Sequence, residues 1–204
     1  MARFRGPRLK LVRRFQAHLP GLTRKSAERR PYPPGQHGPN RRRKMSDYAV
    51  RLEEKQKLRF NYQVSEKQLR KYFKKAKSSK GDTGLRLLQI LETRLDNIVF
   101  RAGLAPTIPA ARQMVAHGHV TVNGKRLDIP SYQVREGEVV SLGAKAKNND
   151  LYKSFFAQPS LVYPTYLDME AKEMTATMKA QPEREDIPVE VQENLIIEHY
   201  NRVA

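Results

Sequence analysis

Few residues in this chain have the types and spacing that catalysis or metal binding would require. His117 and His119 could suggest a metal site, but neither has a cysteine or an acidic residue beside it. They are better explained as a polar contact and a residue at a helix end. The sequence shows no Ser-His-Asp arrangement and no glycine-rich phosphate loop, and it contains no cysteine. It therefore predicts no catalytic residue, no metal and no cofactor, and it excludes disulfides and thiolate ligands.

A polar surface suited to recognition is predicted between residues 109 and 126. If residues 109–117 are helical, their apolar members face inward and their polar members face outward. Gln113 and His117 lie one turn apart and would act together. Such a set, with a neighbouring hairpin tip, suits the backbone and 2′-hydroxyls of folded RNA. The residues assigned to this surface are Arg112, Gln113, His117, Asn123, Lys125 and Arg126.

Positive charge is concentrated in the first two-fifths of the chain. The formal net charge is +18 and the pI about 10.2, which indicates a polyanionic partner. Residues 1–80 contain 25 Lys and Arg against 5 Asp and Glu, whereas the remaining residues contain 14 against 16. A membrane would also attract cations, but no apolar run approaches the roughly 20 residues that span a bilayer. The phosphate-binding candidates are Arg3, Arg5, Arg8, Arg13, Arg14, Arg41, Arg42, Arg43, Lys44, Lys55, Lys57, Arg59, Lys67, Arg70, Lys71 and Lys74.

The elements that must position the central polar surface are two helices and a small β unit. Apolar residues recur at helical spacing over 85–102, which predicts one helix, and a second helix is expected over 107–117. Gly118 ends that helix. Asn123-Gly124 lies between two alternating runs and predicts a β-hairpin with a type I′ turn. A further strand is predicted over 139–142.

The basic part of the chain is predicted to hold an extension and two helices. Residues 1–44 are rich in Arg, Pro and Gly, with too few apolar residues for a core of their own. One short segment could still dock through its apolar residues, which are Phe4, Leu9, Leu11, Val12, Phe15 and Leu19. This extension is either a solvated tail or a segment that becomes ordered when phosphates neutralise it. Helices are expected over 46–60 and 65–76, the second beginning with a capping-box pattern at Ser65 and carrying lysines around its apolar stripe.

The end of the chain differs in charge from the beginning. Residues 168–204 contain 9 acids against 4 bases, so they should point away from phosphate. A helix with one apolar face is predicted over 193–203. The acids would then be free to meet a basic protein neighbour, where electrostatic complementarity favours one docking register. The protein-contact candidates are Glu185, Asp186 and Glu190.

Several stretches resemble the family of ribosomal protein four of the small subunit. They are Arg94-Leu95-Asp96-Asn97, residues 110–132 and 135–142 within the central part, and PPGQHG at 33–38, EEKQKLRF at 53–60 and ENLIIEHYNR at 193–202 outside it. The resemblance covers most of the chain. It implies an α+β fold with a mainly helical domain, an inserted small α-α-β-hairpin RNA-binding module and a basic, extended N-terminal segment. The expected segments are 1–44 (extension), 45–93 (helical), 94–157 (module) and 158–204 (returning to the helical domain).

The same resemblance implies a structural role in the small ribosomal subunit. Expected partners are the five-prime domain of small-subunit rRNA, bound early in assembly, the neighbouring ribosomal protein five, and mRNA near its entry site. Contacts with neighbouring proteins would bear on decoding accuracy. The expected location is the ribosome, in a bacterial cytoplasm or a plastid stroma, with no membrane partner. Some relatives hold zinc with cysteines in the extension, which this cysteine-free sequence cannot do.

Other functions have weaker support in the sequence. Arg94-Leu95-Asp96 resembles the catalytic triplet of pseudouridine synthases, which would make the chain an rRNA-modifying enzyme that docks through the same module. However, the triplet recurs at Arg126-Leu127-Asp128, and only about sixty residues follow the hairpin, which is too few for a catalytic domain. Lys44-Met45-Ser46 echoes a synthetase signature without the rest of that motif. A factor that rescues ribosomal subunits is a third possibility, but such chains are shorter and lack the terminal match.

Overall fold

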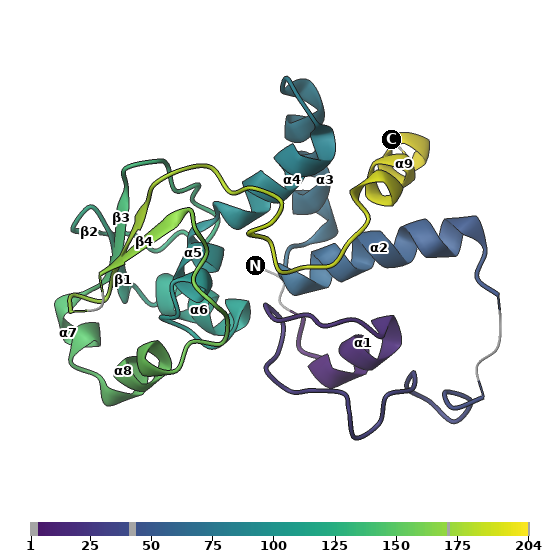
Figure 1. Ribbon diagram of the computed structural model, residues 1–204, viewed down its shortest axis with the longest axis horizontal. Helices are drawn as coiled ribbons and strands as arrows, with labels where there is room; N and C mark the ends of the chain where they lie inside the picture. Colours follow the sequence, from purple (N-terminus) through teal and green to yellow (C-terminus); the bar gives the residue numbers. More distant parts are fainter. Residues whose placement is uncertain (1–3, 41–43, 171, 204) are drawn as a thin grey trace. The chain divides into compact units, whose positions relative to one another are not determined.

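The computed structural model describes residues 4–40, 44–170 and 172–203, and it divides into two compact units (Figure 1). Unit 1 comprises residues 1–87 and 189–204, and unit 2 comprises residues 88–188. The first is helical and the second combines helices with an antiparallel sheet, so the α+β class is confirmed. In the described part of the chain, no helix combines the length and the apolar character that crossing a membrane requires.

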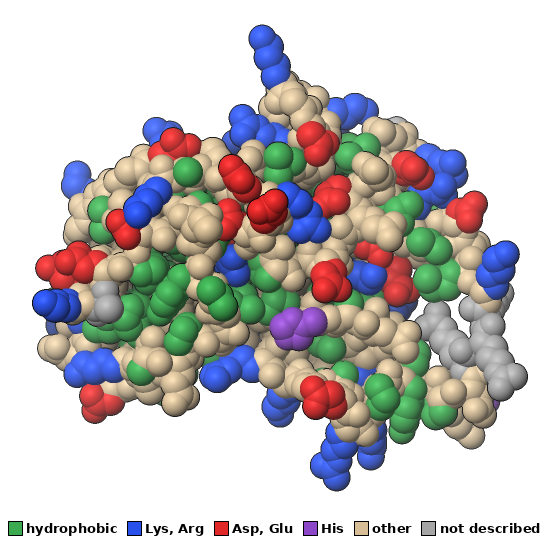
Figure 2. All heavy atoms as spheres, in the orientation of Figure 1, with side chains coloured by type: hydrophobic (Ala, Val, Ile, Leu, Met, Phe, Trp, Pro, Cys, Tyr) green, Lys and Arg blue, Asp and Glu red, His purple; other side chains and the backbone are tan. Residues whose placement is uncertain are grey.

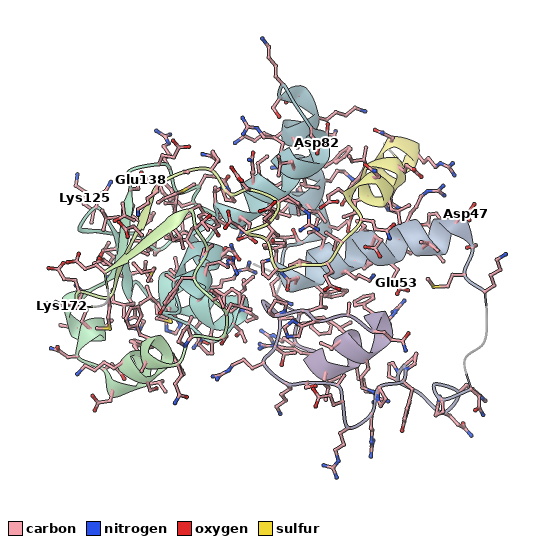
Figure 3. The ribbon with its side chains drawn as sticks, in the orientation of Figure 1. Asp47, Glu53, Asp82, Lys125, Glu138 and Lys172 are labelled. Carbon is pink, nitrogen blue, oxygen red and sulfur yellow. The ribbon has the colours of Figure 1, made fainter. Side chains whose placement is uncertain are left out.

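Unit 1 is helical, and two of its helices begin at a serine side-chain cap. Its helices are α1 (Arg8–Phe15), α2 (Asp47–Asn61), α3 (Glu66–Ser78) and α9 (Glu193–Val203). Ser46 accepts a hydrogen bond from the N–H of Ala49, and Ser65 accepts one from the N–H of Gln68, the second as the capping-box pattern predicted. Figure 3 shows Asp47 in the first turn of α2, where a negative charge is favoured. Helix α9 packs against α2, so both ends of the chain contribute to this unit.

The N-terminal segment buries most of the apolar residues that the sequence analysis expected to dock one short segment. The five members of this apolar cluster, the α1 cluster, are Leu11, Val12, Phe15, Leu19 and Leu22, all buried. Phe60 of α2 packs on this cluster, with its ring 6.0 Å from Phe15 and 5.3 Å from Phe4. Each large apolar side chain buried in this way contributes about 1.5–3 kcal/mol. The prediction that this segment lacks a core was therefore wrong for its described part.

The long helix predicted over 85–102 is in fact two helices, α4 (Thr83–Glu92) and α5 (Leu95–Arg101). Asp82, labelled in Figure 3, caps α4 by accepting from the N–H groups of Gly84 and Leu85 at 3.0 and 3.2 Å. The break occurs because Arg94 is extended (φ −65°, ψ 140°) and forms a β-bridge with Gln133. A local apolar pattern does not reveal this bridge, since its partner lies about forty residues further along.

Unit 2 combines its helices with a five-stranded antiparallel sheet in the order β2-β1-β3-β5-β4. Its elements are α5, α6 (Ile108–Ala116), β1 (Val120–Val122), β2 (Lys125–Arg126), β3 (Val139–Leu142), α7 (Ala144–Lys147), α8 (Asp150–Ala157), β4 (Leu167–Glu170) and β5 (Thr175–Met178). The second helix, the hairpin and the strand over 139–142 are confirmed. Val120, Val140 and Leu142 point into the core, whereas Thr121 and Ser141 face outward and bond each other.

Strands β4 and β5 were not predicted, because the region around them reads as polar and acidic. They form because β5 pairs with β3, placing Ala176 opposite Val140 in the buried layer. As a result, residues 158–188 lie in unit 2 with the sheet, and residues 189–204 lie in unit 1.

Candidate nucleic-acid interface

Two arginines and one aspartate form a buried ionic triad at the centre of unit 2. Asp96 is fully buried and accepts two hydrogen bonds from Arg94, at 2.9 and 2.7 Å. It accepts two more from Arg112 of α6, at 2.9 and 2.6 Å. The prediction that Arg112 faces outward was wrong, because only 7% of it is exposed and its guanidinium is turned towards Asp96. Arg112 is therefore withdrawn from the recognition surface, and the triad joins α5 to α6.

A second buried polar network surrounds Glu92. Its carboxylate accepts from Asn97 at 2.6 Å and from the hydroxyl of Tyr166 at 2.9 Å, and Arg101 lies 3.7 Å away. Burial, reinforced by the charge of Glu92, raises the pKa of Tyr166 well above its ordinary value. Arg94, Asp96 and Asn97, three residues of one sequence motif, are thus all engaged in internal bonds of the fold.

The end of α6 presents the polar residues that do reach the surface. Gln113 and His117 are exposed, as predicted. The N–H of Gly118 bonds to the carbonyl of Val115 and that of His119 bonds to Met114, the pattern of a Schellman cap. Gly118 has φ +73°, which a side chain would strain. This cap turns the chain sharply, so that His117 and His119 lie near each other with ring centroids 6.0 Å apart.

The hairpin separates its two cations. Asn123 and Gly124 both have positive φ, as a type I′ turn requires. Arg126 lies opposite Thr121 and Lys125 opposite Val122, so the two side chains leave opposite faces of the sheet. Arg126 reaches back over Gly118, where any added side chain would collide with its guanidinium.

Lys125 lies at the tip of the hairpin, at the edge of the sheet (Figure 3). The side-chain oxygen of Asn123 accepts a hydrogen bond from the N–H of Val139 at 2.9 Å, so this oxygen is engaged within the fold. Among the three hairpin residues assigned to recognition, Arg126 is therefore the one whose side chain lies beside the end of α6.

Helix α8 adds an aromatic residue that the sequence analysis missed. The ring of Tyr152 lies 5.8 Å from that of His119. The contact arises because Gly143, just after β3, donates to the carbonyl of His119 at 2.8 Å, which brings the start of α7 and α8 beside β1. The only sequence signal was a set of aromatic residues after residue 150, and a local pattern could not show which strand they would meet.

In unit 1, the outer face of α3 carries a row of exposed cations. Leu69, Tyr72, Phe73 and Ala76 are buried, as predicted. Figure 2 shows Lys and Arg side chains projecting near the end of α3 where the chain turns into α4. A shallow hollow on this face is lined by Glu66, Lys67, Arg70, Lys71 and Lys74.

The cations of α2 behave differently from those of α3. Lys55 is buried and donates to Glu66 at 2.8 Å, so the prediction that it binds phosphate is corrected. Burial alone would raise the pKa of Glu66, but the hydrogen bond and charge of Lys55 outweigh it, and that pKa lies below its ordinary value. Lys57 pairs with Glu54, and Arg59 lies 4.9 Å above the ring of Phe60. Both are only partly exposed.

Among the cations of the N-terminal segment, Arg13 has an internal role. It donates to the carbonyls of Arg30 and Tyr32, both at 3.1 Å, and lies 5.1 Å from the centre of the Tyr32 ring. It therefore holds the proline-rich loop against α1. Arg5, Arg14 and Lys44 are exposed and Arg8 is half-buried. Arg3, Arg41, Arg42 and Arg43 lie outside the described residues.

The three acids predicted to meet a protein neighbour differ in their bonding within the fold and in their exposure. Asp186 accepts from both the N–H and the hydroxyl of Thr165, at 3.0 and 2.7 Å. Burial would raise the pKa of Asp186, but these bonds lower it below its ordinary value. Asp186 therefore also has a role within the fold, and its contact with a protein neighbour stays a prediction. Glu185 and Glu190 are exposed.

Comparison with known proteins gives matches along the whole chain. Residues 3–92 match the Ribosomal protein S4/S9 N-terminal domain, and residues 93–140 match the S4 domain. The small ribosomal subunit protein uS4 of Nostoc punctiforme is 54% identical over 205 residues, covering 100% of both chains. That of Synechococcus elongatus is 54% identical and that of Prochlorococcus marinus 52%, each covering 99% of both chains.

The chain belongs to the uS4 family. The S4 domain match covers α5, α6 and the hairpin, which hold the buried triad and the surface at the end of α6. The uS4 N-terminal match covers α1, α2 and α3, where the exposed cations lie. The row of cations on α3 and the polar end of α6 therefore fall within the matched regions, whereas Tyr152 of α8 lies outside them.

Proposed function

We propose that this chain is a structural component of the small ribosomal subunit that binds small-subunit rRNA directly. The full-length identity with uS4 proteins carries this proposal. The proposal is also supported by the division of the cations into those bonded within the fold and those exposed to solvent. Arg13, Lys55, Arg94 and Arg112 are engaged inside the fold, whereas a row on α3 and the surface at the end of α6 remain available to phosphate.

The finer features of the proposal concern the RNA target and the neighbours. The chain binds the folded five-prime domain of the rRNA early in assembly and nucleates the body of the subunit. Glu185 and Glu190 are exposed acids suited to a basic neighbour such as ribosomal protein five. Through these protein contacts, the chain contributes to mRNA entry and decoding accuracy. It resides in the ribosome, in a bacterial cytoplasm or a plastid stroma.

The alternative of a pseudouridine synthase is not favoured. A catalytic aspartate must reach the target base, but Asp96 is fully buried and bound by two arginines. The aspartate of the repeated triplet, Asp128, is exposed on the surface of the module. An isotope-release assay on transcribed rRNA tests this alternative, and release of label in proportion to enzyme would support it.

The proposed function is tested by measuring binding to transcribed five-prime-domain rRNA across a salt titration. Log affinity should fall linearly with log salt, with a slope of about −0.7 to −0.9 for each phosphate contacted. Replacing Lys67, Arg70 and Lys71 by Glu should make that negative slope shallower, by about 2 or more. Lys179→Glu, which alters a cation paired with Asp168 at 3.2 Å, is the control and should change the slope little. A wild-type slope near zero would refute the proposal.

A further inference from the structure

One surface of unit 2 combines aromatic rings with an exposed cation. We call it the aromatic platform, and it consists of His117, His119, Arg126, Tyr152 and Phe155. The ring centroids follow one another at 6.0 Å (His117 to His119), 5.8 Å (His119 to Tyr152) and 6.5 Å (Tyr152 to Phe155). None of the four rings is fully buried. These residues come from three separate elements, so only the folded unit assembles them.

The position of the platform is set by backbone features that surround it. The Schellman cap at Gly118 fixes the two histidines, and the bond from Gly143 to His119 joins β3 and α7 to the same place. Asn149 caps α8 by accepting from the N–H of Leu151 at 2.9 Å. Helix α8 buries none of its residues fully, so core packing alone does not account for the aromatic residues on it.

The charge around the platform is positive. Among the residues that the structure describes, the guanidinium of Arg126 has no carboxylate partner. It leaves the same face of the sheet as Thr121 and passes over Gly118, between the two histidines in the sequence. Lys145 and Lys153 are exposed nearby in the chain, and the latter pairs with Asp150 at 3.5 Å. A ligand with a flat apolar ring and a negative group would satisfy both halves of this surface.

We propose that the aromatic platform holds one unpaired nucleotide of the small-subunit rRNA. Its base stacks on the ring of Tyr152 or His119, and the adjacent phosphate binds Arg126. The two rings are inclined by 54°, so a base stacked on one ring is tilted with respect to the other. Unstacked bases in RNA loops and bulges are commonly bound in this way, and every base has a π-face. This inference rests on the proposed rRNA binding and goes further by assigning a class of nucleotide to a defined site.

The first test measures affinity for transcribed five-prime-domain rRNA with the full chain. Tyr152→Leu should weaken binding by roughly 5- to 150-fold, the effect of losing one base stack. Tyr152→Phe keeps the ring and should bind like wild type, and Leu151→Ala, altering the next residue on α8, serves as the control. Because stacking involves no counterion, Tyr152→Leu should leave the salt slope unchanged, whereas Arg126→Gln should reduce it by about 0.7–0.9.

The second test uses fluorescence, since the chain contains no tryptophan. In a Tyr152→Trp variant, saturating rRNA should quench the emission of the single tryptophan, excited selectively over the tyrosines, whereas in a Leu151→Trp variant it should not. If wild type binds rRNA but Tyr152→Leu binds equally well, or if the Tyr152→Trp emission is unchanged at saturation, the platform proposal is wrong and the proposed function stands. If wild type itself fails to bind rRNA, both proposals are refuted.

Discussion

Replacing Asp96 by alanine should be among the most destabilising single changes in unit 2. Asp96 is completely buried and accepts four charge-assisted hydrogen bonds from Arg94 and Arg112. Its removal leaves two guanidinium groups, which are 2% and 7% exposed, without their carboxylate. Breaking a buried ion pair by removing one partner costs about 3–5 kcal/mol. A typical domain has about 5–15 kcal/mol of stability, so this loss is a large share of the total.

The assay is urea unfolding of the full chain, followed by circular dichroism and by hydrogen exchange of the segments covering α5, α6 and β1. With a urea dependence of roughly 2 kcal/mol per molar, the transition of unit 2 should move down by about 1.5–2.5 M. The matched control is Asp128→Ala, which removes the exposed aspartate of the repeated Arg-Leu-Asp triplet and should change stability by less than about 0.5 kcal/mol. Equal midpoints for the two variants would refute the structural role assigned to the triad.

Three further perturbations test other parts of the molecule. Phe15→Ala should destabilise unit 1 by about 3 kcal/mol in urea unfolding, and an unchanged midpoint would contradict the α1 cluster. Gly118→Ala should cost about 1–2 kcal/mol for the left-handed backbone and also weaken rRNA binding by displacing Arg126, so unaltered affinity would count against the role given to that arginine. Burial, reinforced by Lys55, lowers the pKa of His199, so the unfolded chain takes up this proton first and the free energy of unfolding should fall as pH drops below about 6.5. His199→Gln should flatten that fall between pH 7 and 5, and identical pH profiles would show that another group is responsible.

Local features of the fold could be predicted because their causes lie within a few residues. Ser46 and Ser65 cap helices through the N–H groups three residues ahead, and Asn123-Gly124 specifies its turn through its own φ angles. The basic face of α3 follows from helical periodicity alone. The family resemblance, carried by short motifs along the whole chain, gave the fold class and the kind of partner.

The sequence by itself determined how many cations the chain has and in which part they are concentrated, whereas only the tertiary structure decided which of them are free. Lys55 pairs with Glu66 from the next helix, and Arg112 pairs with an aspartate sixteen positions earlier. Arg13 donates hydrogen bonds to backbone carbonyls about twenty positions later. The same holds for the contact between His119 and Tyr152, which depends on the pairing of β1 with β3. The physical reason is that the neighbours within a few ångströms of a charge or a ring decide whether it is available to a ligand. Many of these neighbours are far away in the chain, and helical or strand periodicity carries no information about them.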